Sequence, residues 1–353
     1  MSLGIKNTVF SLFAWRNKMS QFKNLVFEGG GVKGIAYVGA VQALADNEIL
    51  PDISRVAGTS AGAITAALLA LGADGTQLRS ILEKADFKSF MDGIFLGNAV
   101  RLFRKYGWFK GDAFSEWMKD QVGTISGNPD MTFGELDGRA KIEPQKYRKL
   151  HIVGTNLSTQ RTEEFSAIDT PDTTIWEAVR LSMSIPLFFA SVGYKSGVCV
   201  DGGVSWNYPI DIFDDKKYLS RPDNALLFDV PTYTRYHDDH VYNKETLGFR
   251  VDTKDEIAAE MKSWELPRKD INDVGEYAMA LSDFALGMAN KMHLHKNDWH
   301  RTVFIDSGDV SFTNFSLPKE KIDMLVNKGV SCTEEYFKWF NNRDNNVINR
   351  VVR

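Results

Sequence analysis

The stretch RVAGTSAGAI, residues 55–64, places one serine between two glycines at the spacing Gly-x-Ser-x-Gly, as Gly58, Ser60 and Gly62. Apolar residues precede the serine, and alanine-rich, helix-forming residues follow it. This order predicts a buried strand that turns sharply into a helix, with Ser60 at the turn. Glycine two positions before and after the serine relieves the crowding of so tight a turn. The pattern favours a nucleophilic serine, and the alternative is a glycine-rich turn that only packs a helix on a strand.

The residues on either side of this stretch predict a parallel α/β sheet. NLVFEGGG (24–31) is typical of a short buried strand that ends in glycines, and the apolar pattern of 32–47 indicates a helix. A second strand is expected at 53–58, and a nearly all-apolar helix, which belongs inside a domain, at 61–73. Strand, helix, strand and helix in close succession indicate a parallel sheet with buried strands.

The rest of the chain predicts further elements of one domain. Strands are expected at 150–159, 163–167, 198–204, 225–230 and 302–306, and helices at 112–123, 173–185 and about 270–296. Asp112 is the expected N-cap of its helix, and the Gly/Pro/Lys-rich stretch 124–149 is expected to be a surface connection.

The composition is ordinary for a soluble globular protein with a sizeable core. The chain has 353 residues, of which 43% are apolar and 25% charged. Its net charge of -4 argues against a general nucleic-acid binder. Two cysteines, Cys199 and Cys332, suggest no disulfide framework, so we expect a reducing, cytoplasmic setting. No apolar run is long enough for a membrane-spanning helix.

Two segments are candidates for peripheral membrane contact. Residues 1–23 form a basic, amphipathic extension without acidic residues, and they make a poor signal peptide because no small-residue cleavage site follows the short apolar part. This extension could lie on a membrane or dock on its own domain. In 86–111, large apolar residues alternate with Arg101, Arg104, Lys105 and Lys110, as in a lid or membrane-facing surface, or in a helical pair that covers the core.

A second glycine motif, EGGGVKG at 28–34, closes the first expected strand. It matches the dinucleotide-binding pattern through Gly29, Gly31 and Gly34, so a nucleotide-binding fold is a rival interpretation. That fold expects an acidic residue at the end of the second strand, where this chain has Ser60. A P-loop is also disfavoured, because the motif's lysine is followed by glycine. Consecutive glycines at a helix start offer backbone N–H groups to an anion, so we expect an oxyanion hole beside the serine.

The expected proton acceptor for Ser60 is Asp201 in VCVDGGVSWNYP (198–209). An aspartate at a strand end followed by two glycines can project its carboxylate over the sheet edge, although a plain Asp-Gly turn is the alternative. Burial should raise the pKa of this aspartate, and a hydrogen bond from the serine should oppose that shift. None of the histidines lies in a recognisable turn after a strand, as a Ser-His-Asp enzyme would require; they are His151, His237, His240, His293, His295 and His300.

The ordered set of motifs resembles the patatin-like phospholipase family. GGGVKG (29–34), GTSAG (58–62) and DGG (201–203) match its Gly-Gly-Gly-x-Arg/Lys-Gly, Gly-x-Ser-x-Gly and Asp-Gly-Gly/Ala blocks. LSMSIPLFFA (181–190) looks like its Ser-x-Ala-x-Pro-x-x-Phe block, with Met183 and Ile185 in place of small residues. DGGVSWNYPI resembles its Asp-Gly-Gly-x-x-x-Asn-x-Pro continuation, and the likeness runs from about residue 24 to about residue 340.

This resemblance implies a three-layer α/β/α sandwich with a mostly parallel central sheet. It also implies a lipid acyl hydrolase of the phospholipase A or lysophospholipase type, with Ser60 as nucleophile, Asp201 as base, and neither metal nor cofactor. The resemblance implies an oxyanion hole formed by Gly29, Gly30 and Gly31, to which Ala61 is added on general grounds. It also implies a nucleophile elbow with Gly58 and Gly62. The other motif residues are Lys33, Gly34, Gly202 and Gly203.

The same reasoning gives domain boundaries and alternatives. A catalytic domain is expected at 24–340, between the extension at 1–23 and a tail at 341–353. The substrate is expected to be a membrane phospholipid or another acyl lipid. The sequence does not identify a regulator, although the first 24 residues or a separate regulator could restrain the activity. An acyltransferase or thioesterase using the same two residues, or a Ser-His-Asp esterase, are the alternatives. A non-catalytic scaffold ranks lower because the nucleophile and the base are both present.

Overall fold

The computed structural model describes residues 21–92, 106–226, 239–257, 297–312 and 314–342, with a few single positions between 271 and 288. Most of the expected extension at 1–23 and tail at 341–353 lies outside these residues. So do the centre of the 86–111 stretch and most of the expected helix at 270–296. Among the described residues, no helix is both long and apolar enough to cross a bilayer.

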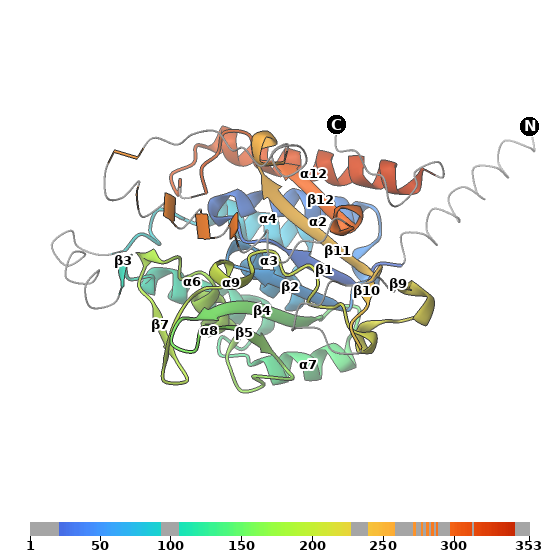
Figure 1. The fold of residues 1–353 in the computed structure, drawn as a ribbon, viewed down its shortest axis with the longest axis horizontal. Helices are drawn as coiled ribbons and strands as arrows, with labels where there is room; N and C mark the ends of the chain where they lie inside the picture. Colours follow the sequence, from blue (N-terminus) through green and yellow to red (C-terminus); the bar gives the residue numbers. More distant parts are fainter. Residues whose placement is uncertain are drawn as a thin grey trace, which may run out of the picture.

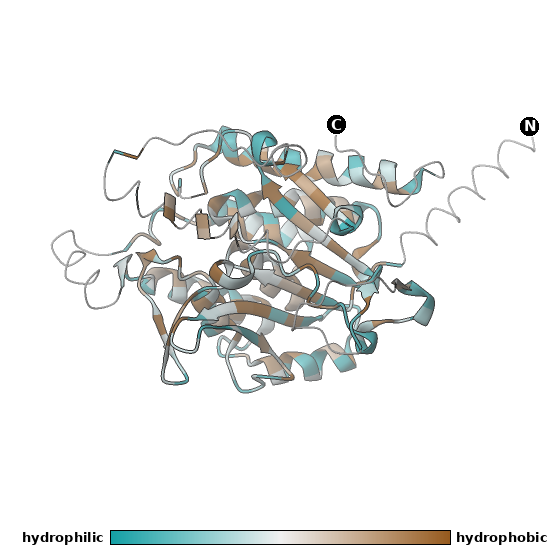
Figure 2. Cartoon of the chain, viewed as in Figure 1, coloured by the Kyte–Doolittle hydropathy of each residue, from teal (hydrophilic) through white to brown (hydrophobic). Residues whose placement is uncertain are grey.

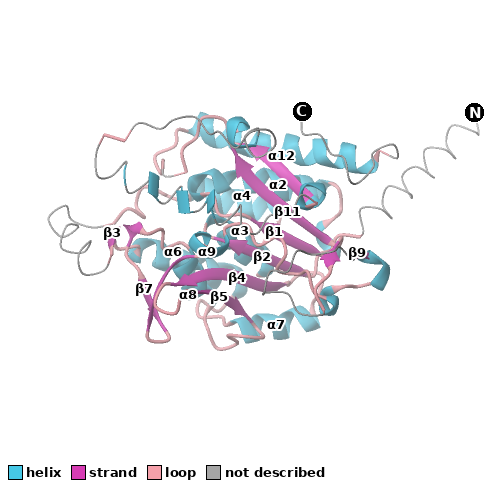
Figure 3. Ribbon diagram, viewed as in Figure 1, coloured by secondary structure: helices cyan, strands magenta, loops and turns pink. Residues whose placement is uncertain are grey.

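One mostly parallel sheet runs through the middle of the molecule (Figures 1 and 3). Its order is β12-β11-β1-β2-β4-β8-β7, with β5 also paired to β4. The parallel strands are β1 (Asn24–Phe27), β2 (Arg55–Thr59), β4 (Lys149–Asn156), β11 (Thr246–Asp252) and β12 (Thr302–Asp306). The antiparallel strands are β5 (Arg161–Ser166), β7 (Val192–Tyr194) and β8 (Gly197–Asp201).

Helices cover both sides of this sheet, which confirms the predicted α/β/α architecture (Figure 3). The helices are α2 (Ala36–Asp46), α3 (Ala61–Ala70), α4 (Gly75–Lys84), α6 (Asp112–Ser126), α7 (Phe133–Ile142), α8 (Ile175–Ser182), α9 (Gly203–Trp206) and α12 (Lys319–Asn341), with a 3-10 turn η1 (Gly31–Ile35) before α2. Two small pairs complete the fold: β3 (Gly107–Phe109) with β6 (Leu187–Phe189), and β9 (Ala225–Leu226) with β10 (Tyr242–Asn243).

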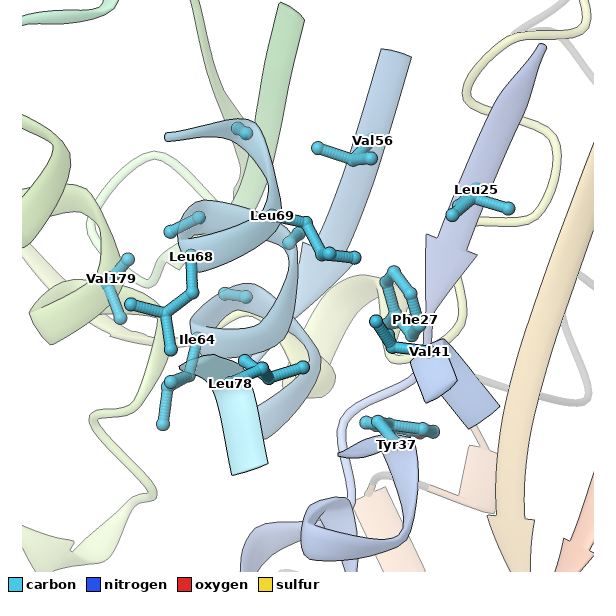
Figure 4. Close-up of a cluster of buried hydrophobic side chains, with 14 of the residues drawn as sticks. Leu25, Phe27, Tyr37, Val41, Val56, Ile64, Leu68, Leu69, Leu78 and Val179 are labelled. Atoms are coloured by element: carbon cyan, nitrogen blue, oxygen red, sulfur yellow. The ribbon is translucent and has the colours of Figure 1, made fainter. Parts of the chain in front are cut away.

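Alternation along the central strands divides the core into two layers. Leu25 and Phe27 of β1 and Val56 of β2 pack with α2 and α3 on one face (Figure 4). Val26, which lies between Leu25 and Phe27, and Ala57, which follows Val56, face the other side of the sheet. There the segment after α9 covers them. Because successive side chains of a strand point to opposite faces, strands buried on both sides must be apolar throughout. Figure 2 shows this as brown strands at the centre, while teal residues lie on the outer helices.

The last helix, α12, closes the layer over α2 through two glycines. A Cβ atom on Gly39 would lie 1.9 Å from the Val326 carbonyl oxygen, and one on Gly329 would lie 1.9 Å from the Ala36 carbonyl oxygen. The two backbones therefore touch at this crossing, which any larger residue would separate.

The structure corrects the sequence-based expectations at several elements. The stretch 124–149 is not only a surface connection, because it contains α7, whose start is fixed by a capping box between Thr132 and Glu135. Strand β11 and helices α4 and α12 were not expected. Of the strand expected at 225–230, the described part is β9, and the remainder lies outside the described residues.

The N-terminus of α6 is capped by a residue distant from it in the sequence. Asp112 is the first helical residue and not the N-cap, which is Gly111. The carboxylate of Asp92 accepts hydrogen bonds from the amides of Gly111, Asp112 and Ala113 at 2.7, 2.9 and 3.1 Å. A carboxylate that accepts three helix-terminal N–H groups satisfies orphan donors and also opposes the positive end of the helix dipole.

We therefore expect Asp92→Ala to lower the free energy of unfolding by about 1–2 kcal/mol, because three amides lose a charged acceptor. Asp112→Ala should cost less than about 1 kcal/mol, since that carboxylate only adds to the dipole interaction. Urea unfolding of both variants at neutral pH measures the difference. Equal losses would show that Asp92 does not cap α6.

Candidate active site

Ser60 joins β2 to α3 in a strained turn. Its φ of 52° and ψ of −124° lie outside the regions that residues with side chains normally adopt. The residue is 4% exposed, and its amide donates to Ser182 Oγ at 2.8 Å. The turn points the side chain away from the strand axis and sets it at the N-terminus of an apolar helix, as in a nucleophile elbow.

The two glycines beside Ser60 are required by space and not by backbone angle. A Cβ atom on Gly58 would lie 2.3 Å from the Gly62 carbonyl oxygen. A Cβ atom on Gly62 would lie 2.2 Å from the Phe27 carbonyl oxygen and 2.6 Å from that of Glu28. The helix that follows Ser60 therefore starts directly against the end of β1. This explains the glycine on each side of the serine.

The glycine loop after β1 lies next to this elbow. A Cβ on Gly29 would lie 3.1 Å from Ser60 Cβ, and one on Gly34 would lie 2.8 Å from Ala61 Cβ. Gly31 has a φ of +54°, and its Cα faces the Phe312 carbonyl oxygen, which would be 2.2 Å from a Cβ. Side chains at Gly29 and Gly34 would push the two turns apart, and one at Gly31 would collide with the backbone of Phe312.

The amides of this loop differ in what they bind. The Gly29 N–H donates to the Asn207 carbonyl oxygen at 3.0 Å, so it is already engaged. Within the described residues, no acceptor faces the N–H of Gly30, Gly31 or Ala61. Amides at the starts of η1 and α3 have no partner inside their own helices, and such donors bind anions.

Asp201 ends β8 and is 1% exposed. Its Oδ1 accepts the Gly203 amide at 2.7 Å, whereas Oδ2 has no partner among the described residues. Burial raises the pKa of Asp201 to about 7, although the nearby Ser60 hydroxyl and the Gly203 amide lower it. The upward direction is the one expected for a buried carboxyl.

The structure brings Ser60 and Asp201 side by side without a direct hydrogen bond between their side chains. Ser60 Oγ donates to Met183 Sδ at 3.5 Å, and Asp201 Oδ2 accepts no hydrogen bond among the described residues. A sulfur is a weak acceptor, so little energy opposes rotation of the serine hydroxyl towards the carboxylate.

Strand pairing explains why the two residues meet. Thr59 of β2 pairs with Val153 of β4, and Asp201 of β8 pairs with the next residue, Gly154. Strand β5 occupies the other edge of β4 over residues 151–156, so β2 and β8 share one edge and meet end to end. Ser60 and Asp201 therefore adjoin at the meeting point.

A buried polar network that the sequence did not reveal holds the glycine loop. Asn207 Nδ2 donates to Glu28 Oε1 and to the Gly29 carbonyl oxygen, both at 3.2 Å. Arg250 Nε lies 3.4 Å from Glu28 Oε2, and both side chains are 2% exposed. Asn207 belongs to the DGGVSWNYPI block and could have been marked there, but no local pattern marks Arg250 on β11.

The remaining motif residues have structural contacts. Lys33 is buried, and its Nζ pairs with Glu256 Oε2 at 3.4 Å. A Cβ on Gly202 would lie 2.1 Å from the Val153 carbonyl oxygen, so this glycine lets β8 end against β4. The Gly203 amide donates the one described hydrogen bond that the Asp201 carboxylate accepts.

The described histidines are bonded elsewhere than to Ser60. His151 lies on β4, where Nδ1 is 2.7 Å from Glu164 Oε1 and the ring packs against Phe213. The backbone of His240 forms an isolated β-bridge with that of Asp215, and the ring of His300 stacks on Trp339. His237, His293 and His295 lie outside the described residues. In the part of the chain that the structure describes, no three His, Cys, Asp or Glu side chains form a group suited to a metal ion.

The ends of the 86–111 stretch pack into the protein. Phe90 is 3% exposed and contacts Phe114 and Trp117, and Phe109 contacts Phe188. The basic and apolar residues at 93–105 lie outside the described residues. A hollow of about 900 Å³ on the outer side of α8, lined in part by Trp176 and Tyr194, includes neither Ser60 nor Asp201.

We expect Gly62→Ala to lower the free energy of unfolding by about 3 kcal/mol, because the added methyl overlaps two backbone carbonyls of the neighbouring turn. Gly138→Ala in α7 is the control. Nothing lies within 4 Å of a Cβ at Gly138, so that variant should gain up to about 1 kcal/mol of helix stability. Urea unfolding compares them, and a neutral Gly62→Ala would contradict the close approach of the two turns.

Comparison with known proteins identifies the family of this fold and site. A family model described as patatin-like phospholipase matches residues 25–214, more than half of the chain. The uncharacterized protein R571 of Acanthamoeba polyphaga mimivirus is 33% identical over 197 residues, which are 56% of this chain and 63% of that protein. The chain thus spans less than two thirds of that relative.

Two further similarities extend the comparison. The probable lipid hydrolase 463L of invertebrate iridescent virus 6 is 26% identical over 217 residues, which cover 60% of this chain and 71% of that protein. The crystal structure of VipD from Legionella pneumophila superposes with a TM-score of 0.57 at 18% identity, covering 90% of this chain and 67% of that one. At this identity the second likeness shows the fold alone.

Proposed function

The chain belongs to the patatin-like phospholipase family, and from this premise we propose that it is a lipid acyl hydrolase of the phospholipase A or lysophospholipase type. In this proposal Ser60 is the nucleophile and Asp201 the base. The observation that carries it is the meeting of a strained serine with a buried carboxyl whose pKa is about 7. The named similarity to a probable viral lipid hydrolase supports the substrate class.

Acylation would begin with transfer of the Ser60 hydroxyl proton to Asp201 Oδ2. The serine oxygen then attacks the acyl carbonyl carbon, and negative charge develops on the carbonyl oxygen. The amides of Gly30, Gly31 and Ala61 are the proposed donors to this oxyanion. The Gly29 amide could join them only by giving up its bond to Asn207. Removing one such donor typically costs roughly 3 kcal/mol of barrier.

Completion of the cycle requires the same aspartate to act as an acid. The proton held by Asp201 passes to the leaving alcohol as the tetrahedral intermediate collapses to the acyl-enzyme on Ser60. Water then enters, gives a proton to Asp201, and attacks the acyl carbon, after which the proton returns to Ser60. A carboxyl with a pKa near 7 suits both directions, because it exchanges protons readily close to neutral pH.

Substitution of the two proposed catalytic residues tests this function. Ser60→Ala and Asp201→Asn should each lower kcat by at least roughly 10³-fold in release of fatty acid from lysophospholipid or liposomes. His151→Gln, on β4, is the control and should keep the activity of the wild type for each folded molecule. A fluorophosphonate should label the wild type at Ser60, as located by mass spectrometry. Normal activity of Asp201→Asn together with loss in a histidine variant would replace the dyad by a triad.

The physical form of the substrate distinguishes a hydrolase of membrane lipid from an acyltransferase or an enzyme that acts on soluble acyl esters. Rates on bilayers, on micelles and on soluble acyl esters should favour the aggregated lipid if the proposed substrate class is correct. Transfer of the acyl group to an added alcohol in preference to water would indicate an acyltransferase that uses the same residues.

The pH dependence follows from the pKa of Asp201. The base must be ionised to accept the serine proton, so kcat/KM on a soluble ester should rise as the pH increases through about 7 and then level off. The free energy of unfolding changes with pH in the opposite direction to kcat/KM. The folded pKa is raised, so the stability that the protonated carboxyl contributes is complete below about 4 and is lost as the pH rises through about 7.

Asp201→Asn should therefore be more stable than the wild type above pH 7, by up to about 4 kcal/mol, and the difference should shrink as the pH falls towards 4. Urea unfolding at several pH values measures it. A pH-independent difference would show that Asp201 is not the group that titrates.

A further inference from the structure

The end of α8 and the residues after it contact both sides of the proposed catalytic pair. Ser182 Oγ accepts the Ser60 amide at 2.8 Å and donates to the Val153 carbonyl oxygen at 2.6 Å. Two residues later, the Ser184 carbonyl oxygen accepts the Asp201 amide at 2.8 Å. Ser182 and Ser184 are both fully buried. One short piece of backbone thus holds the main chain of both residues.

The bond from Ser182 acts where the backbone is strained. The amide of Ser60 belongs to the residue with a φ of 52°, and Ser182 Oγ is its described acceptor. A hydroxyl can accept that amide and at the same time donate to a carbonyl, which the side chain of alanine cannot do. The carbonyl is that of Val153, the residue that pairs with Thr59. Ser182 therefore links the nucleophile turn to β4 at the point where β2 ends.

Arg180 fixes the same turn from the other side. Its guanidinium donates to the carbonyl oxygens of Lys110, Gly111 and Ala190 at 2.7, 3.2 and 3.1 Å. It also donates to Ser184 Oγ at 2.6 Å, and that hydroxyl donates back to the Arg180 carbonyl oxygen at 3.0 Å. The side chain is 7% exposed. The turn after α8 is thereby anchored to two other segments, at residues 110–111 and at Ala190, which limits its movement.

We propose that the segment Arg180–Ser184 sets the separation of the nucleophile from the base, with Ser182 as a positioning residue for Ser60. This inference rests on the proposed function, because it assigns the two held residues their catalytic roles. Ser182 touches the Ser60 backbone and not the reacting atoms, so it acts on chemistry through geometry. The hydroxyl of Ser60 must rotate from Met183 to Asp201, and it reaches the carboxylate only if the backbone of Ser60 stays in place.

The test compares Ser182→Ala with Ser166→Ala in the full chain. Ser166 on β5 is a similarly buried serine whose hydroxyl donates to Asp169 Oδ2 and accepts the Ile168 and Asp169 amides, so these bonds stay within its own turn and none reaches Ser60 or Asp201. We expect Ser182→Ala to lower kcat on a soluble p-nitrophenyl ester by about 10²-fold with KM changed less than twofold, since small misplacement of a reacting group has effects of this size. Ser166→Ala should keep the kcat of the wild type.

Two further measurements make the outcome specific. The rate of fluorophosphonate labelling of Ser60 should fall in Ser182→Ala in parallel with kcat. Ser182→Cys, which is close in size but a weaker acceptor, should lie between the wild type and the alanine variant, and it serves as the test if alanine prevents folding. Thermal unfolding gives the folded fraction on which each rate is based.

Two results would overturn the inference: equal kcat values for Ser182→Ala and Ser166→Ala, or a loss confined to KM. Failure of the proposed function would differ, because the fluorophosphonate would then label a residue other than Ser60 in the wild type.

Discussion

Two strands that share one edge of β4 determine the geometry of this protein. Strand β2 pairs with β4 up to Val153, and β8 begins its pairing at the next residue, Gly154, running in the opposite direction. Their carboxyl ends therefore face each other. Chain segments about 140 residues apart in the sequence meet head to head, and whatever residue follows each strand is placed at the junction. The residues there are Ser60 and Asp201.

A meeting of this kind needs space for backbone, and glycines provide it. Gly62 lets α3 start against the carbonyls at the end of β1, and Gly202 lets β8 end against the Val153 carbonyl. Gly34 allows η1 to lie against the first residue of α3. In each case the added Cβ would lie less than 3.0 Å from an atom of the neighbouring turn. The glycines therefore allow the N-termini of η1 and α3 to lie close together.

The sequence predicted the parts of this arrangement that local pattern encodes. The serine elbow, the glycine loop and the Asp-Gly-Gly turn each have a signature within a few residues, and a strand-helix alternation predicts a parallel sheet. The expected reason for the position of Asp201 was different, however, because the sequence does not show that β8 is antiparallel. The carboxyl end of a parallel strand lies at the same edge of the sheet as the carboxyl ends of its neighbours. Strand β8 is antiparallel, and its carboxyl end comes next to that of β2 because β8 pairs only with the last three residues of β4.

Contacts between distant segments could not be predicted in the same way. The cap of α6 comes from Asp92, and the Gly29 loop is braced by Arg250 through Glu28, so neither partner lies near its target in the sequence. The strand that carries Arg250 was itself missed, although Leu247, Phe249 and Val251 alternate with polar or small residues in TLGFRVD, a period-two pattern that local reasoning could have found. Helix α7 was missed because its glycines and lysines suggested a connection, although Thr132 and Glu135 form a capping box that local reasoning could have found.

The site concentrates two unfavourable features that the rest of the fold must offset. A backbone conformation such as that of Ser60 costs on the order of 1–3 kcal/mol, and a buried carboxyl disfavours its own ionisation. Neither is relieved by an opposite charge, since no cation contacts Asp201 among the described residues. A lysine or arginine there would hold the pKa low and weaken the carboxylate as a base. The strain is instead supported by neutral contacts: amide to hydroxyl at Ser182, amide to carbonyl at Ser184, and close backbone packing at the glycines. These contacts hold the backbone of the two residues and place no opposite charge beside Asp201, so burial remains the largest influence on its pKa and keeps that pKa raised.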